Sequence, residues 1–503
     1  MKNAILFFLI GISLNVFSQI QKINLQTGHI ERNKKLNADK VEGTLGKSGD
    51  YFFILRSNDR ERGEAQKKKL SIEKYDSRLN HKKTVPIEDI YLVSYRELLG
   101  KDDKCFEFFV RDGGDNLYLF YSQIKSDYNY LYKMKLNPKT VIFERAEEVS
   151  KQIMPNSDLD RRMTYITSIS KDRNHLAISS IMGSEKNADY NIYIEVFNGL
   201  MESQWVQNTL LPRYNEGDTK QASEYLVDFN YRGVGETLIG ISNQGVFNIT
   251  KQVGRETRSM RKHLVYSFKD GESAPVINEI KFDGKNIDTF SFTYDDDGFL
   301  RVIGCFYYDK NKIDGLAYLK MDAVSLEKTQ TNLIEFDAKN MEDFLTAVNP
   351  PNKKKDKKLK DIYDKIIDIY VHDNQSMTLL LEDRGGVYGN LKFINLSEKG
   401  KIVWIKNYFK YQNYHKSVSD MMIDDKLHLL FNNLKAGQKL DHVVFDHLTG
   451  KITTKTIIDF KEDDELDGYY YMPNSLSYVD EHTYIGVAEY FKLYKLLKFE
   501  FNQ

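Results

Sequence analysis

The sequence predicts an all-β protein, a single β-propeller of about eight four-stranded blades, from three observations. A unit of strand, Asp/Asn/Gly turn and second strand recurs every 50 to 80 residues or so, about the length of a four-stranded repeat with long loops. Tyr and Phe number 33 and 29 whereas Pro occurs only 8 times, a balance that favours strands. The repeated segments lack a 3.6-residue period, which argues against helical repeats.

Each unit is marked by the polar turn between its first two strands. The eight turns lie in KSGDYFFIL near Asp50, RDGGDNLYLF near Asp115, KDRNHLAIS near Asn174, YRGVGETLIG near Gly235, YDDDGFLRVIG near Asp297, VHDNQSMTLLL near Asn374, IDDKLHLLF near Asp425 and VDEHTYIGV near Glu481. Seven blades is the alternative count, because element boundaries are the least certain part of a sequence interpretation.

The N-terminus has the features of a secretory signal, residues 1–18. Lys2 precedes an apolar core from Ala4 to Val16, and small residues at Val16 and Ser18 place cleavage before Gln19. No second apolar run is long enough to span a membrane. We therefore expect an exported protein, periplasmic or extracellular, whose residues 19–503 form the propeller domain.

Two segments complete the expected ring. The last unit shows three strands before the chain stops, so we expect Ile20–Ile30 to supply the fourth and to close the ring, which removes an exposed sheet edge. Residues 337–365 lengthen one repeat. Their sequence, Lys-rich in its second part, predicts a small insertion of two short helices around a Pro-Pro-Asn turn.

Charge and cysteine content exclude several classes of protein. The 72 basic and 73 acidic residues give a net charge of −1, so nothing indicates binding to nucleic acid. Two cysteines in a secreted chain of 503 residues do not form a disulfide scaffold. Cys105 and Cys305 lie in apolar strands of units two and five, so we expect two buried thiols and no bond between them.

No cofactor, metal or catalytic motif reaches useful specificity. The contiguous Asp residues of YDDDGF lack the alternation of an EF-hand and predict a hairpin turn. Gly46-Lys47-Ser48 lacks the first glycine of a phosphate loop and precedes a strand. His442 and His447 lack the HExxH arrangement, and we expect them to face solvent at a strand start and in a turn. There is no G-x-S-x-G elbow.

One resemblance supports the fold and the location. LKFINLSEKGKIVWIKNY followed by KLHLLFNN, with a signal ending in FSQ, resembles a pattern of uncharacterised secreted β-propeller-like proteins of Bacteroidota. The resemblance is best in the second half of the chain. Its motifs mark blade turns, so it implies a fold and an exported location but no activity.

Function is expected on the face that carries the loops between strands two and three, because rigid scaffolds carry binding residues on loops. The candidate binding residues there are basic or aromatic: Arg255, Arg258, Arg261, Arg384, Tyr469, Tyr470 and Tyr471, with the Lys-rich run Lys353–Lys360 beside them. A solvated loop is the competing interpretation of the charges, and strand packing that of the tyrosines.

The function most consistent with these features is a non-enzymatic binding or scaffolding propeller that engages a protein or a cell-envelope glycan. The alternative is a glycan-acting enzyme, or a carbohydrate-binding propeller, with its site at the central channel. Carboxylates around such a channel would escape a search for linear motifs. Two of them about 5 to 9.5 Å apart would favour a glycosidase.

Overall fold

A computed structural model gives the fold. It describes residues 23–28, 39–58, 67–93, 99–100, 102–153, 165–183, 190–211, 238–253, 262–280, 282, 285, 287–306, 313–347, 364–383, 390–410, 418–433, 439–462, 466–490 and 493–501. The predicted signal, residues 1–18, lies outside them. Within the described residues, no helix combines the length and the apolar character needed to cross a membrane.

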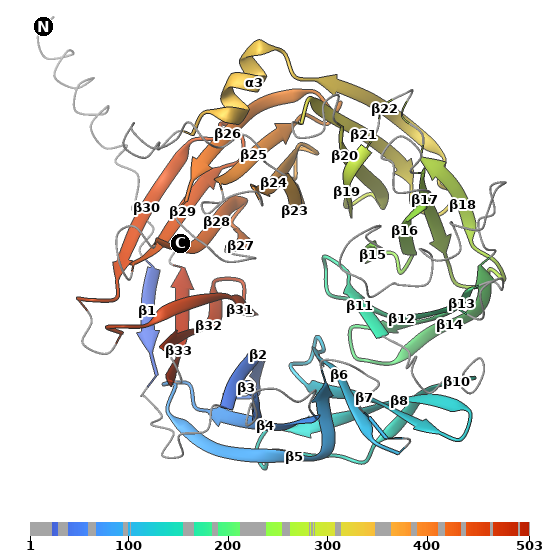
Figure 1. The fold of residues 1–503 in the computed structure, drawn as a ribbon, viewed down its shortest axis with the longest axis vertical. Coiled ribbons are helices and arrows are strands. Elements are labelled where there is room, and N and C mark those ends of the chain that lie inside the picture. Colours follow the sequence, from blue (N-terminus) through green and yellow to red (C-terminus); the bar gives the residue numbers. More distant parts are fainter. Residues whose placement is uncertain are drawn as a thin grey trace, which may run out of the picture.

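The strands form eight blades around a central space, which confirms the predicted β-propeller (Figure 1). Blade 1 comprises β2 (Asp39–Ser48), β3 (Tyr51–Asn58), β4 (Lys67–Tyr75) and β5 (His81–Val93), and blade 2 comprises β6 (Lys104–Arg111), β7 (Leu117–Lys125), β8 (Tyr128–Asn137) and β10 (Glu147–Ile153), with β9 (Ile142–Phe143) beside β8. Blade 3 comprises β11 (Tyr165–Ile169), β12 (His175–Gly183), β13 (Tyr190–Asn198) and β14 (Ser203–Leu211). Blade 4 comprises β15 (Leu238–Ile241), β16 (Phe247–Val253), β17 (Lys262–Phe268) and β18 (Val276–Ile280).

The remaining four blades complete the ring. Blade 5 comprises β19 (Ile287–Tyr294), β20 (Phe299–Phe306), β21 (Gly315–Asp322) and β22 (Lys328–Glu335), and blade 6 comprises β23 (Asp364–Val371), β24 (Met377–Asp383), β25 (Asn390–Leu396) and β26 (Ile402–Phe409). Blade 7 comprises β27 (Ser419–Ile423), β28 (Lys426–Asn433), β29 (Lys439–Asp446) and β30 (Ile452–Asp459). Blade 8 comprises β31 (Tyr470–Asp480), β32 (Thr483–Tyr490), β33 (Leu493–Phe501) and β1 (Ile23–Thr27). In Figure 1 the first strand of each blade lies nearest the central space.

The N-terminal strand closes the ring, as the sequence predicts. β1 pairs antiparallel with β33, from Ile23 opposite Phe501 to Thr27 opposite Leu497. Blades 1 and 2 are also joined, because the end of β5 pairs in parallel with the start of β6 through Ile90 and Tyr91. β1 covers the edge of β33, which would otherwise be a site where sheets associate.

The core lies between neighbouring blades. One cluster joins Ile303 and Leu316 of blade 5 to Leu379 and Leu381 of blade 6, and all four are fully buried. Middle strands such as β7 and β25 bury both faces because each blade is covered on two sides, whereas outer strands such as β22 stay partly exposed. Cys105 in β6 and Cys305 in β20 are buried in blades 2 and 5, as predicted.

The polar turns are built by local hydrogen bonding. Asp112 Oδ1 accepts from the backbone N–H groups of Gly114 and Asn116, at 2.9 and 2.8 Å, and Oδ2 accepts from the Asn116 amide. Asp115 takes a φ of 62°, the left-handed region that Asp and Asn tolerate. The YDDDGF hairpin is confirmed as well, with Gly298 at a φ of 85°.

Two details of the expected organisation differ. The first turn of blade 4 is Ser242–Gly245 and not the segment near Gly235, which lies outside the described residues. Phe247–Val253, which follow this turn, form the second strand of the blade, β16. Within the predicted insertion, the structure describes helix α3 (Ala338–Leu345), capped by Asp337, and β23 begins at Asp364. The Pro-Pro-Asn turn and the Lys-rich run lie outside the described residues.

Candidate functional site

A cavity of about 240 Å³ lies at the turn side of the ring. Its walls come from the ends of β6 and β31 and from the first turn of blade 3. Blades 2, 3 and 8 therefore meet at this cavity, although blade 1 lies between blades 8 and 2 in the ring. Blade 2 reaches blade 8 directly, because Arg111 Nη2 donates to the Val479 carbonyl oxygen over 3.3 Å.

Two arginines face one tyrosine in this cavity. The Arg173 guanidinium carbon lies 3.8 Å from the centre of the Tyr478 ring, and that of Arg111 lies 5.3 Å from it. Cations are attracted to the ring face, so Tyr478 helps to hold two like charges close together. Burial, together with the charge of Arg173, lowers the pKa of Arg111.

The guanidinium group of Arg111 includes a hydrogen-bond donor that is not used within the described residues. Its side chain is 12% exposed, its Nε lies 3.8 Å from Asp115 Oδ1, and its Nη1 has no hydrogen-bond partner among the described residues. A buried donor without a partner costs free energy, and a bound acceptor would remove that cost. The arrangement suits a carboxylate or another anion with acceptor oxygens.

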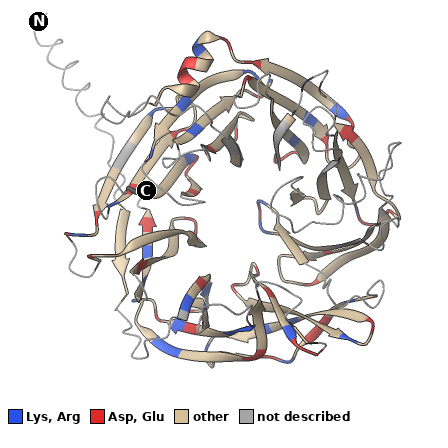
Figure 2. Ribbon diagram, viewed as in Figure 1, with Lys and Arg blue, Asp and Glu red and all other residues tan. Residues whose placement is uncertain are grey.

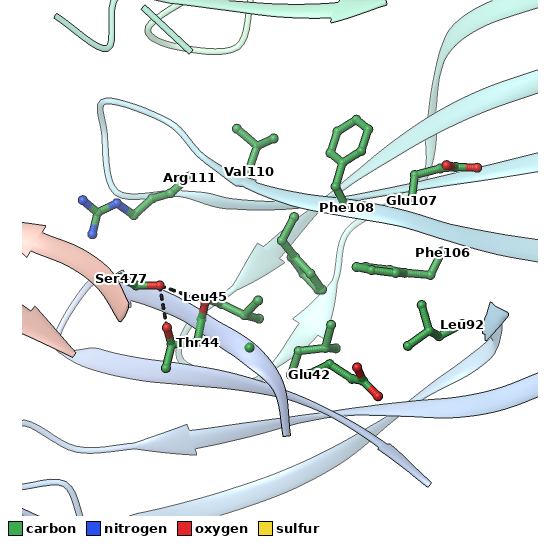
Figure 3. A pocket seen from close by; sticks show the side chains of 13 residues that line it. Glu42, Thr44, Leu45, Leu92, Phe106, Glu107, Phe108, Val110, Arg111 and Ser477 are labelled. Atoms are coloured by element: carbon green, nitrogen blue, oxygen red, sulfur yellow. Dashed lines mark hydrogen bonds between the residues drawn. The ribbon is translucent and has the colours of Figure 1, made fainter. Parts of the chain in front are cut away.

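Arg111 also borders a second, larger cavity of about 510 Å³ between blades 1 and 2 (Figure 3). The β6 side of this cavity is largely apolar, with Phe106, Phe108 and Phe109 partly exposed to it. After the bulge in β6 between Phe106 and Phe108, Phe109 lies on the same side as Phe106, toward blade 1, whereas Phe108 packs toward blade 3. The aromatic residues of β6 therefore line a wall of the larger cavity, and Arg111 lies at the end of this wall, where the two cavities meet.

Two glutamates line the larger cavity, and each has polar partners. Glu42 accepts a hydrogen bond from Ser57 and lies 3.9 Å from Lys68, while Glu107 accepts from Ser122. Figure 3 shows the two carboxylates on different strands, with the Phe106 ring between them in this view. They are not arranged as two acidic groups facing one polar pocket.

A different carboxylate pair lies on the inner strands of blades 6 and 7. Asp368 on β23 hydrogen-bonds to Asp420 on β27, and the Tyr370 hydroxyl donates to Asp420. Desolvation, together with the negative charge of Asp420, raises the pKa of Asp368 to about 7, although its side chain keeps contact with solvent. Two carboxylates in such contact share a proton.

The predicted site residues are only partly described. Arg255, Arg258, Arg261, Arg384 and Lys353–Lys360 lie outside the described residues. The three tyrosines alternate along the chain, as expected of a strand. Tyr469 and Tyr471 are 3% and 2% exposed and pack in the core, and the Tyr471 hydroxyl lies 2.7 Å from Ser419 Oγ. Only Tyr470, at 43% exposure, presents an aromatic face to solvent.

The expectation that His442 and His447 face solvent is wrong. His442 lies inside β29 at 0% exposure, with its Nε2 3.1 Å from Nδ1 of His428. His447 is 7% exposed and packs between the turns of blades 6 and 7. The sequence placed each residue near a strand end, but the neighbouring blade covers both positions.

Sequence reasoning also missed Arg111, Arg173 and Tyr478, which lie in three different units. A usable signal exists in the repeat. The first turns of all units share one face of a propeller. Aligning the units on these turns would have placed the basic residues of units two and three and the tyrosine of unit eight on that face.

No protein-family model matches the chain, and no curated protein sequence matches it. Among solved structures, polysaccharide lyase Uly1 is similar over 88% of this chain and 98% of its own, at 13% identity and a TM-score of 0.36. The β-propeller domain of the Trilobed protease from Pyrococcus furiosus is similar over 83% and 98%, at 9% identity and a TM-score of 0.37. A PL25 ulvan lyase is similar over 72% and 79%, at 12% identity and a TM-score of 0.34.

These likenesses are too weak to carry an activity from one protein to another. The fold is nevertheless clear from the chain itself. Eight blades surround one central space, and the first strand of each blade lies nearest to it. The N-terminal strand completes the last blade and closes the ring. The chain is a β-propeller.

Proposed function

We propose that this chain is an exported, non-enzymatic binding protein that holds an acidic segment of a protein partner at the turn-side cavities of its ring. The observation that carries this proposal is Arg111 Nη1, a buried donor without a hydrogen-bond partner in the described part of the chain. It lies where the two cavities meet, and Arg173 and Tyr478 lie beside it.

The residues that line the two cavities indicate the chemistry of the ligand. Arg111 and Arg173 fit a carboxylate, and guanidinium groups bind carboxylates with paired hydrogen bonds. The partly exposed Phe106 and Phe109 fit apolar side chains next to that carboxylate. Among the described residues, acidic and basic side chains are interspersed over the ring, so this part of the chain presents no broad field of one sign (Figure 2).

Binding is favoured over catalysis at the larger cavity because both of its glutamates already have partners. Glu42 interacts with Ser57 and Lys68, and Glu107 with Ser122. A general acid or base has to be able to reach the substrate with its proton-carrying oxygen. The unsatisfied group at this site is a cation, which serves recognition.

The test compares Arg111→Gln with Arg78→Gln on an array of peptides that combine Asp or Glu with aromatic residues and on an array of uronic-acid oligosaccharides. Arg78 is an exposed arginine of the β4–β5 turn and serves as the matched control. We expect the wild type and Arg78→Gln to bind the same acidic peptides, and Arg111→Gln to lose at least about tenfold in affinity.

Three outcomes separate the possibilities. Preferential binding to the oligosaccharides would replace the protein partner by a glycan. Equal binding of the wild type and Arg111→Gln would remove the cavity from the proposal. The loop-rich face is tested separately by deletion of Asn349–Lys360: a partner lost only from that variant would place recognition on the insertion.

The second candidate function is a glycan-acting enzyme, favoured by the shared proton of Asp368 and Asp420. A pKa of about 7 suits an acid that gives and takes a proton near neutral pH. Their direct hydrogen bond brings the two groups closer than the roughly 5 to 9.5 Å of a paired-carboxylate glycosidase. The pair would therefore act as one proton-sharing group. Turnover of uronic-acid oligosaccharides by the wild type, abolished in Asp420→Asn, would establish this alternative.

A further inference from the structure

Three side chains converge where the turns of blades 6 and 7 meet. His372 follows β23, Asp425 lies in the turn between β27 and β28, and His447 follows β29. One ligand atom from each, two imidazole nitrogens and a carboxylate oxygen, lie within 4.8 Å of one another. The two imidazole rings stack with their centres 3.9 Å apart.

Hydrogen bonds fix which nitrogen of His447 faces the carboxylate. His447 Nδ1 lies 2.7 Å from the backbone carbonyl oxygen of Asp425. A carbonyl oxygen only accepts, so Nδ1 carries the proton. In the neutral ring Nε2 then bears a lone pair, and this atom lies 3.2 Å from Asp425 Oδ2. A lone pair and a carboxylate oxygen repel each other unless a cation lies between them.

His372 has a similar arrangement. Its Nε2 lies 2.8 Å from Thr378 Oγ1, and its Nδ1 lies 3.3 Å from Asp425 Oδ1. Thr378 Oγ1 also accepts from the amide of Asn395. With Nε2 donating to Thr378, the lone pair of Nδ1 points at the carboxylate.

The distances fit a small divalent ion. Zn²⁺ lies about 2.0 to 2.1 Å from histidine nitrogen and about 2.0 to 2.2 Å from carboxylate oxygen, so two ligand atoms at a tetrahedral angle are about 3.4 Å apart. The two N–O separations here are 3.2 and 3.3 Å. Asp425 is 43% exposed, so it can adjust and leaves a fourth position open to solvent.

The geometry points to a transition-metal site, His372 Nδ1, His447 Nε2 and the Asp425 carboxylate, that binds Zn²⁺ and cross-links the turns of blades 6 and 7. Two imidazoles exclude Mg²⁺ and Ca²⁺, which prefer oxygen ligands. The hydrogen bonds of the other ring nitrogens, to Thr378 and to the Asp425 carbonyl, are the outer contacts that orient metal-binding histidines.

The test measures Zn²⁺ binding by calorimetry on the full chain after removal of metal with EDTA. Asp425→Asn removes the carboxylate, and Asp424→Asn is its matched control. Both aspartates are 43% exposed in the same turn, but Asp424 lies 3.8 Å from His482 instead. We expect one Zn²⁺ per chain in the wild type and in Asp424→Asn, and at least about a hundredfold weaker binding in Asp425→Asn and in His447→Gln.

A spectroscopic measurement identifies the ligands without relying on the stability of a variant. Cu²⁺ bound to the wild-type chain should show coupling to two imidazole nitrogens by electron paramagnetic resonance, and to fewer in His372→Gln. Absence of a one-to-one site in the wild type would overturn the inference and leave Asp425 as the partner of a protonated imidazole. Equal Zn²⁺ affinity of Asp425→Asn and the wild type would overturn it as well.

Discussion

Replacement of the buried histidine pair of blade 7 should reduce the acid sensitivity of the fold. His428 and His442 are both 0% exposed, and their rings contact each other and Phe501 of β33. Burial lowers the pKa of His442 to about 4, and burial together with His442 lowers that of His428 to about 3. Both rings are therefore neutral in the folded protein at pH 5.

The magnitude follows from proton binding by the unfolded chain. An exposed histidine has a pKa of about 6.5, so at pH 5 each unfolded histidine gains about 2 kcal/mol from protonation that the folded one does not. The lowered pKa of a base means that stability is complete above pH 6.5 and is lost as the pH falls. The pair should account for about 4 kcal/mol of the stability difference between pH 8 and pH 5.

The assay is urea unfolding of the wild type and of His428→Leu/His442→Leu at pH 8 and pH 5. The wild type should lose about 4 kcal/mol more than the variant over this interval, whatever the stability of the variant at pH 8. His81→Gln, at a half-buried surface histidine, should keep the wild-type pH dependence. An equal loss in the wild type and the double variant would refute the assignment of two neutral histidines.

Three further outcomes follow from the fold. Asp295→Ala should lower the free energy of unfolding by about 3 to 5 kcal/mol, because it leaves Arg301 buried without its carboxylate, whereas Asp296→Ala, at a 50% exposed neighbour, should change it by under about 1 kcal/mol in the same urea titration. Asp368→Asn should raise the melting temperature more at pH 8 than at pH 5, because the raised pKa means that ionisation of Asp368 destabilises the fold as the pH rises; an equal shift at both pH values would contradict the shared proton. Deletion of Ile23–Thr27 should expose the edge of β33 and promote self-association, detected by light scattering, and a monodisperse variant of unchanged stability would argue against closure by β1.

The repeat was predictable because its determinants are local. Asp112 closes its turn with Gly114 and Asn116, all within five residues, and similar side-chain-to-backbone bonds form in the first turns of blades 3, 5, 6 and 8. Strand content and the alternation of apolar residues are local as well. Closure by the N-terminal strand required one further inference, from the missing strand of the last unit.

The candidate sites were not predictable in the same way because they depend on contacts between blades. Arg111 and Tyr478 are 367 positions apart in the sequence and meet only in the closed ring. His447 lies in a turn and appeared exposed, but packing of blade 6 against blade 7 buries it beside His372. Burial of a strand-end residue is decided by the neighbouring blade, which a linear pattern does not contain.

The turn side of the ring owes its suitability for binding to hydrogen bonds between successive turns. Asp172 N–H donates to Asn243 between the first turns of blades 3 and 4, and Gln244 donates to Asp297 between those of blades 4 and 5. Gly113 N–H donates to Gly199 in the β13–β14 turn of blade 3, and Arg111 donates to the Val479 carbonyl oxygen of blade 8. These bonds hold the turns that carry Arg111 and Arg173 before any ligand arrives, so less conformational entropy is lost on binding than a flexible loop would lose. This argument favours the turn side of the ring as the place of recognition.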